Sequence, residues 1–361
     1  MRPNDSGRRL RRKMIPMAAS LIAATIALAG CGGDGDQADA ASQDTVTVKN
    51  CGEEITFPSP AKRIFVNENP MLSMLFTLDA DDQIAAVSGI SDGKRDMLEE
   101  IFDPERIDDL PHKTDQYPTI ENILVEKPDV VLAGFGWGYS VDDNLTPSHL
   151  YQEHEISAYT SSTTCEQETS DEARGIMPPW EALYTDITNL GKIVGRSDRA
   201  TSVVADIKRR LEKLKSAPSA DEPATVFSIN LIGKEVTSGG AFSAAHGVIE
   251  AAGGRNANED VKDQWARLSW ERVAASNVDY FLITDIGAGD HSYKNKVREL
   301  KENPATKNLD AVKESRFIRI PRVMVLDTPL MIDSAELLRK ALEDEGLAPE
   351  SSIEPELEIH D

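Results

Sequence analysis

Residues 200–215 read ATSVVADIKRRLEKLK, a segment in which apolar and charged side chains alternate at helical spacing. The apolar positions on one face are Ala200, Val203, Val204, Ile207, Leu211 and Leu214. Apolar residues three and four apart line one side of an α-helix, so the segment predicts an amphipathic helix. No strand pattern interrupts residues 180–217, and Pro218 and Pro223 end the helical pattern. We therefore expect one long connecting helix in this part of the chain.

Short apolar strands alternate with helices on both sides of the connector. Before it, a hairpin is predicted at 45–48 and 55–57, strands at 63–66, 83–88, 130–133 and 156–160, and helices at 71–78 and 120–125. After it, strands are predicted at 226–231, 280–284 and 317–320, and helices at 248–252, 297–300 and 331–342. This succession is typical of βαβ units with mainly parallel sheets. The expected fold class is α/β, with two Rossmann-like lobes at residues 45–179 and 218–345.

The N-terminus carries an export signal. Basic residues precede an apolar stretch at residues 14–30, and they are Arg2, Arg8, Arg9, Arg11, Arg12 and Lys13. The stretch ends in Leu28-Ala29-Gly30-Cys31, which resembles a lipobox cut before Cys31. Two acyl chains on Cys31 would anchor the protein stably on the extracytoplasmic face of the cell membrane. We expect a lipoprotein signal peptide at 1–30 and a flexible tether at 31–44; a plain secretory peptide and an uncleaved anchor helix are the alternatives.

The cysteine count points to an oxidising compartment. The chain has three cysteines, and lipidation of Cys31 leaves Cys51 and Cys165 as a pair. A disulfide between them is the expected arrangement in an exported protein. Two separate buried thiols are the alternative, because the sequence does not place their Cα atoms within bonding range.

The charge of the chain argues against a nucleic-acid partner. The formal net charge is −23, and removing residues 1–30, with six basic residues and one acidic, leaves −28. Such a surplus of carboxylates repels a phosphate backbone. No basic residue follows Lys340, and we expect residues 346–361 to form a largely disordered acidic tail.

Three segments stand out along the chain: ENILVEKPDVV at 121–131, GVIEAAGGRN at 247–256 and SWERV at 269–273. Together they resemble the Fe/B12 periplasmic-binding family, and the resemblance extends over roughly residues 45–345. It implies an ABC-importer binding protein whose stiff connecting helix permits only small closure. It also implies that Glu121 and Glu250 dock to a permease dimer that works with its ATPase. A carrier of this kind performs no chemistry and has no catalytic residue or cofactor of its own.

The ligand residues are expected on loops at the carboxyl ends of the strands, where open α/β sheets leave a crevice. The loops that this rule selects are residues 67–70, 89–95, 135–139, 231–240, 287–291 and 322–325. Aromatic faces and cationic groups suit a bulky, partly anionic chelate. The candidates are Lys94, Arg95, Trp137, Tyr139, Trp265 and Arg322, with Trp265 supported by a cleft tryptophan in the cobalamin-binding relative. A ferric siderophore is the expected ligand, and cobalamin and haem are the alternatives.

Other classes of function have weaker patterns. Gly89-Ile90-Ser91-Asp92-Gly93 matches the nucleophile elbow of a serine hydrolase, although His291 and His360 are the only late histidines. Gly134, Gly136 and Gly138 lack the last glycine of a dinucleotide loop. His149 and His154 do not share a helical face, so we expect no protein-bound metal. An adhesion or scaffold module is a third class, and it predicts no saturable small-molecule binding.

Overall fold

The structure is a computed structural model that describes residues 44–114, 118–133, 154–168, 170–287 and 289–359. Residues from 43 onward belong to one compact unit. The predicted lipidation site Cys31 and the candidates Trp137 and Tyr139 lie outside the described residues. Their predicted roles therefore stay predictions.

The N-terminal lobe is built on a five-stranded parallel sheet with the order β5-β4-β3-β6-β7. Its strands are β3 (Ile64–Asn67), β4 (Ile84–Ser88), β5 (His112–Thr114), β6 (Val130–Ala133) and β7 (Ser157–Thr160). The helices are α1 (Asn69–Thr77), α2 (Asp92–Glu99), α3 (Pro104–Asp108) and α4 (Ile120–Val125). Two antiparallel hairpins flank the sheet: β1 (Thr45–Asn50) with β2 (Glu53–Pro58), and β8 (Glu166–Gln167) with β9 (Ser170–Arg174). Short 3-10 turns follow α1 and β7, namely η1 (Asp81–Gln83) and η2 (Ser162–Thr164).

The C-terminal lobe contains a four-stranded parallel sheet and a smaller antiparallel one. The parallel strands are β13 (Arg255–Asn256), β10 (Thr225–Ile229), β15 (Tyr280–Asp285) and β16 (Phe317–Pro321), in that order. The antiparallel strands are β11 (Leu231–Ile232), β12 (Val236–Gly239) and β14 (Trp265–Leu268). The helices are α8 (Ala244–Ala251), α9 (Trp270–Ala275), α10 (Tyr293–Glu302), α11 (Asp310–Lys313) and α12 (Met331–Asp344), and η3 (Arg322–Val325) follows β16. Residues 231–240 thus form a hairpin instead of the predicted loop.

The two lobes repeat one local arrangement at the entry to a central strand. In the first lobe, the Asp129 carboxylate accepts from the backbone N–H groups of Lys62 and Arg63, at 2.7 and 3.0 Å. In the second, Asp279 accepts from the N–H of Thr225 at 2.7 Å. Each aspartate precedes a buried strand and ties it to the start of its neighbour, so unpaired amides at the sheet edge are satisfied. The predicted α/β class with two lobes and mainly parallel sheets is confirmed.

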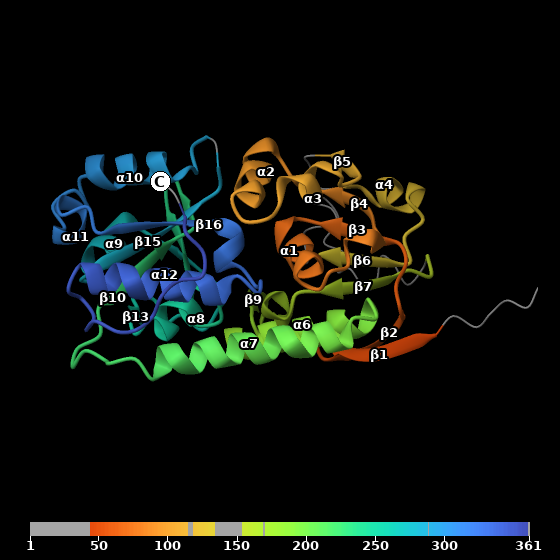
Figure 1. Cartoon of the computed structure of the whole chain (residues 1–361). Coiled ribbons are helices and arrows are strands. Elements are labelled where there is room, and N and C mark those ends of the chain that lie inside the picture. The colour runs from red at the N-terminus through yellow and green to blue at the C-terminus, as the bar shows by residue number, and fades with distance from the viewer. Residues whose placement is uncertain (1–43, 115–117, 134–153, 169, 288, 360–361) are drawn as a thin grey trace, which may run out of the picture. The chain divides into compact units, whose positions relative to one another are not determined.

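The connector consists of two helices where a single one was predicted. They are α6 (Pro179–Ile193) and α7 (Ser197–Lys215), which pack side by side (Figure 1). The break falls at Gly195, whose φ of +67° lies in the left-handed region that ends helices. Gly191 lets the helices approach, since a Cβ there would stand 2.3 Å from the Cβ of Ala200. The apolar face predicted for residues 200–214 is the face that α7 buries.

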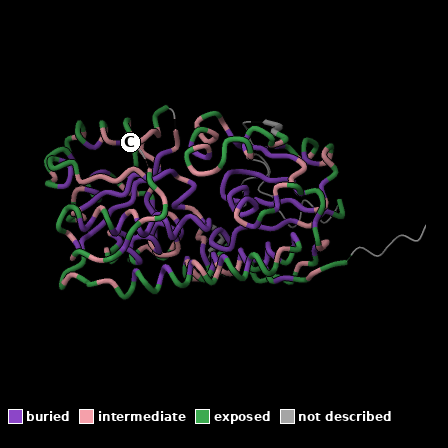
Figure 2. The backbone as a smooth tube through the Cα atoms, viewed as in Figure 1, coloured by how far each residue is buried: buried purple, intermediate pink, exposed green. Residues whose placement is uncertain are grey.

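Burial follows the strands and the inner faces of the connector. Figure 2 shows the tube through both sheets mainly in purple and the outer turns of the helices in green. The strands β3, β6, β10 and β15 are buried at every position. Strands covered on both faces need continuous apolar runs, which is why these four were visible in the sequence.

The predicted disorder of residues 346–361 is wrong for the part up to Ile359. Ile353 and Ala348 are buried, and Leu347, Leu357 and Ile359 pack against the main core. Arg339 donates to the carbonyl of Pro349 at 2.6 Å and holds the start of this segment on α12. The prediction failed because it weighed the acidic composition of the segment and overlooked its few apolar residues. These are widely spaced and pack on the core without forming a helix or strand.

Candidate functional site

The carboxyl ends of the two parallel sheets meet at a contact between α2 and the segment that follows β15. Gly287, with φ at +86°, lies so near that a Cβ on it would be 2.6 Å from the carbonyl oxygen of Gly93. Only a residue without a side chain allows this approach. The edges predicted to carry the functional residues are therefore in contact across the lobes.

A buried carboxylate joins cations from the two lobes at this edge. Glu68, at the end of β3, accepts from the Lys94 ammonium at 2.5 Å, and its other oxygen lies 4.0 Å from the Arg322 guanidinium. The side chain of Glu68 is 1% exposed, whereas those of Lys94 and Arg322 are 17% and 21% exposed. We call these three residues the central triad. Its carboxylate lies beneath two cations that solvent still reaches.

The second lobe extends the triad inward. Arg322 donates through Nε to the side-chain oxygen of Asn230 at 3.2 Å. Behind Asn230, the buried Lys296 donates to the carbonyls of Asn230 and Thr284, at 2.5 and 2.6 Å. Burial, with the nearby Arg322 charge also contributing, lowers the pKa of Lys296 to about 7 even though Asp285 opposes the shift. The chain of contacts runs from the interior of the second lobe to the surface of the first.

A second ion pair crosses the lobes beside the triad. Arg319 on β16 makes two 2.8 Å bonds to the Glu100 carboxylate at the end of α2, and a 2.7 Å bond to Asp285. A forked guanidinium–carboxylate pair fixes orientation as well as distance. It holds the end of α2 against β16.

A buried polar seam joins the lobes near the connector. Asp186 on α6 accepts from the Tyr159 hydroxyl at 2.6 Å and from the Ser162 amide at 2.9 Å. Asp327 accepts from the hydroxyls of Ser161, at 3.1 Å, and Thr163. Burial raises the pKa of Asp186 to about 7 and that of Asp327 to about 6, although the hydrogen bonds oppose both shifts.

The predicted ligand residues are distributed unevenly. Lys94 and Arg322 come together in the central triad. Trp265 is the first residue of β14. It lies beside the buried polar seam, because the side chain of the preceding Gln264 donates to the Thr163 hydroxyl at 3.1 Å. Arg95 instead pairs with Glu99 and Asp108 of its own lobe. Arg95 is thus the weakest of the four described candidates.

The two predicted docking glutamates both lie on capped helices. Glu121 is the second residue after the cap Thr119 and is fully exposed, and a hydrogen bond from the Thr119 side chain lowers its pKa. Glu250 lies near the end of α8, and its carboxylate is 3.2 Å from the His246 ring. That hydrogen bond lowers the pKa of Glu250. Both carboxylates are therefore held charged at neutral pH.

Three groups important to the site were not selected from the sequence: Glu68, Lys296 and Asp327. Glu68 lies in a loop that the carboxyl-end rule did select, but the search favoured cations and aromatics. Lys296 is a charged residue on the buried side of α10. A charge on the apolar face of a predicted helix is a signal that the sequence analysis could have used. Asp327 has no local signal, since its partners come from the other lobe.

The hydrolase interpretation does not fit the geometry at Ser91. That residue caps α2 with a φ of −76° and a ψ of 165°, an ordinary extended backbone. A nucleophile elbow needs a sharp, strained turn at the serine. In the part of the chain that the structure describes, no group of three or more His, Cys, Asp or Glu residues could hold a metal, and no helix is long and apolar enough to cross a membrane.

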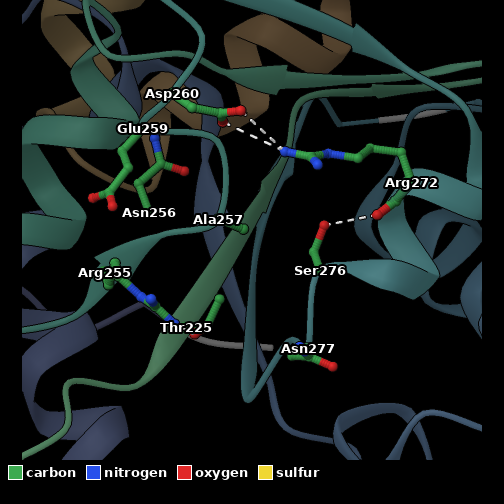
Figure 3. Close-up of a pocket in the computed structure, with 9 residues that line it drawn as sticks. All are labelled: Thr225, Arg255, Asn256, Ala257, Glu259, Asp260, Arg272, Ser276 and Asn277. Atoms are coloured by element: carbon green, nitrogen blue, oxygen red, sulfur yellow. Dashed lines mark hydrogen bonds and ion pairs between the residues drawn. The ribbon is translucent and has the colours of Figure 1, made fainter.

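A cavity of about 320 Å³ lies in the C-terminal lobe near the start of β10 (Figure 3). Thr225 opens β10 and accepts from Arg255 at 2.6 Å, while Arg272 pairs with Asp260 at 3.3 Å. Strand starts lie at the edge opposite the central triad, because the sheet is parallel. The cavity's arginines are paired within the lobe, so it does not form part of the candidate site.

The geometry can now be compared with known proteins. The sequence pattern described as "Periplasmic binding protein" matches residues 68–323, which is most of the chain. The chain belongs to this family. It is the same Fe/B12 family that the three sequence segments resemble. The relatives that match this chain are substrate-binding components of ABC transporters, which are not enzymes.

Individual relatives of this periplasmic binding protein are distant. An uncharacterized ABC transporter substrate-binding lipoprotein, YvrC of Bacillus subtilis, is 22% identical over 340 residues, 90% of this chain and 95% of that protein. A periplasmic binding protein from Veillonella parvula superimposes with a TM-score of 0.67 at 21% identity, covering 83% of this chain and 98% of the other. The ABC-type Fe3+-hydroxamate transport protein from Saccharomonospora viridis gives 0.65 at 21% identity, covering 82% and 98%. These structures establish the shared fold.

Proposed function

We propose that this chain captures a ferric siderophore between its lobes and delivers it to the permease of an ABC importer. The observation that carries the proposal is the central triad: Lys94 and Arg322 come from opposite lobes and converge on one buried carboxylate. Cations that solvent reaches at such a junction suit the oxygen-rich rim of a metal chelate. The similar Saccharomonospora protein is named for Fe3+-hydroxamate transport, which supports the same class of cargo.

The proposed location is the outer face of the cell membrane, through a lipid on Cys31. The lipobox-like Leu28-Ala29-Gly30-Cys31 supports it, as does the name of the Bacillus relative, a lipoprotein. Mass spectrometry of the protein recovered from membranes tests it. A mature N-terminus without an acyl group on Cys31 would contradict the anchor.

The proposed permease contacts are Glu121 and Glu250. Val125 lies one helical turn after Glu121 on α4 and is 75% exposed, and among the described residues the only other exposed large apolar side chain is Ile176. A partner that binds at Glu121 would bury Val125 in the same contact. The first lobe therefore offers both an orienting charge and an apolar contact.

Ligand binding is tested by tryptophan fluorescence quenching with a panel of ferric siderophores, cobalamin and haem. We expect saturable quenching by a ferric siderophore, and at least tenfold weaker binding in the Lys94→Ala and Arg322→Ala variants because each removes a charged hydrogen bond. Saturation only by cobalamin or haem would assign one of these as the cargo instead. No saturation by any member of the panel would refute the proposal.

Docking is tested by the double variant Glu121→Arg with Glu250→Arg. Uptake of the chelate should stop while its affinity for the isolated protein stays unchanged, because charge reversal disrupts orientation at the permease alone. Glu271→Arg is the matched control, since Glu271 is also fully exposed and follows a serine cap. Normal uptake by the double variant would remove the docking assignment.

A further inference from the structure

We infer that Glu68 is a specificity-determining residue, which makes the site prefer a ferric chelate of low net charge over a trianionic one. The inference rests on the proposed function and concerns the same site. Glu68 lies under Lys94 and Arg322, the two partly exposed cations at the junction of the lobes. Its carboxylate cancels about half of the positive charge that these cations present to a cargo.

The backbone of Glu68 is held in a costly conformation. Its φ of 77° and ψ of 157° fall in a region that residues other than glycine rarely adopt. Such a conformation is energetically unfavourable, and the strain persists where the surroundings impose it, commonly at functional sites. The Glu68 amide donates to the Ser88 carbonyl at 2.9 Å, which fixes the turn between β3 and α1. The strained turn thus places the Glu68 carboxylate within 2.5 Å of the Lys94 ammonium.

Each of the two cations has a second partner besides Glu68. Lys94 also donates to the carbonyl of Gly89 at 2.7 Å. Arg322 also donates to the Asn230 side chain at 3.2 Å. Loss of the Glu68 charge should therefore leave both cations in place. What changes is the charge that the cargo meets.

The other ionisable groups nearby are the same in wild type and in a Glu68 variant. Lys296 is fully buried behind Asn230, and its pKa of about 7 means that much of its charge is lost above neutral pH. Asp285 and Glu100 share Arg319, so this group carries a formal charge of −1. A substitution of Glu68 therefore changes the charge at the junction against a constant background.

Charge balance affects neutral and trianionic chelates differently. By Coulomb's law, a unit charge interacts three times as strongly with a −3 chelate as with a −1 chelate at the same distance. The same charge contributes almost nothing to a neutral chelate. Glu68 therefore weakens the binding of a triscatecholate type of complex and leaves that of a trihydroxamate type nearly unchanged.

The test compares two ferric complexes, a neutral trihydroxamate and a trianionic triscatecholate, on wild-type protein and on Glu68→Gln. We expect the variant to bind the triscatecholate about tenfold more tightly and the trihydroxamate within about threefold of wild type. Asp108→Asn is the control, since it removes a carboxylate that pairs with Arg95 inside one lobe. Glu68→Gly provides a second variant that removes the charge and also relaxes the strained backbone.

The outcomes separate this inference from the proposed function. Binding of either complex by wild type, with an unchanged preference in both Glu68 variants, would overturn the role of Glu68 and leave the siderophore proposal intact. A wild-type preference for the trianionic complex would overturn it as well. Failure of wild type to bind either complex, while the protein remains folded, would overturn both.

Discussion

His246 determines how the carboxylate of Glu250, the proposed permease contact, is held. The amide of Asn256 is fixed in orientation, because its nitrogen donates to the Gly239 carbonyl at 3.0 Å and its oxygen accepts from the Asn258 amide at 3.1 Å. That nitrogen also faces Nδ1 of His246 at 3.3 Å, so Nδ1 must accept and Nε2 must carry the proton. Nε2 then donates to Glu250 at 3.2 Å.

Replacing His246 tests this arrangement at the residue scale. The substitution His246→Leu should raise the pKa of Glu250, because the hydrogen bond from His246 is the largest cause of its lowered pKa. An NMR titration that follows the carboxyl carbon of Glu250 measures this pKa. Glu271 serves as the internal reference, since hydrogen bonds from its own backbone N–H and from the Ser269 side chain lower its pKa independently of His246. An unchanged Glu250 titration would contradict the assigned proton position.

At the scale of elements, the disulfide links the first hairpin to the end of the first sheet. Cys51 lies in the turn between β1 and β2, and Cys165 directly follows η2; their Cα atoms are 5.1 Å apart. The predicted bond between Cys51 and Cys165 is thus confirmed. It joins residues 114 apart in the sequence, a long loop in the unfolded chain.

Removal of the disulfide should destabilise the protein strongly. The chain-entropy argument gives a loss of about 4–5 kcal/mol for the double variant Cys51→Ser with Cys165→Ser. Urea unfolding measures the difference, and the variant should be insensitive to reductant while wild type is not. Equal midpoints for the two proteins under oxidising conditions would contradict a stabilising role.

The C-terminal segment is predicted to behave as a structural element despite its acidity. Ile353 is 4% exposed within the main core, so Ile353→Ala should lower the free energy of unfolding by roughly 2–4 kcal/mol. Glu354→Ala, at the adjacent exposed position, is the control. Urea unfolding of both variants tests this prediction. If the segment were detached from the core, neither substitution would change the free energy of unfolding.

At the scale of the whole molecule, buried carboxylates couple the lobes to pH. Asp327 of the second lobe accepts from Ser161 and Thr163 of the first, and Asp186 lies beside them. The pKa values of about 7 for Asp186 and about 6 for Asp327 exceed that of an exposed aspartate near 4. The folded protein therefore retains protons at pH 5–7 that the unfolded chain has released.

Stability should accordingly rise as the pH falls from 7 to 5.5, by on the order of 2 kcal/mol. The low pKa of Lys296 acts mainly above pH 7, and the part of its titration that falls below pH 7 opposes this trend only weakly. Urea unfolding across the range measures the gain, and Asp186→Asn should remove most of it. A stability that falls steadily from pH 7 to 5.5 would show that both carboxylates are ionised in the folded state.

The elements found from the sequence alone are those whose burial leaves a local pattern. The strands β3, β6, β10 and β15 are continuous apolar runs because helices cover both faces of their sheets. The break at Gly195 was missed because the apolar pattern continues on either side of it. The hairpin of β11 and β12 was predicted as a loop, since strands of two and four residues carry too few positions to show alternation.

The candidate site was predictable only in part. Lys94 and Arg322 could be selected because the rule of carboxyl ends depends on strand order along the chain, which the sequence determines. The role of Glu68 could not, since a glutamate after a strand is indistinguishable in sequence from a solvated one. Only the tertiary structure buries it between cations that are 228 residues apart in the chain, and a charge so placed has no local signature.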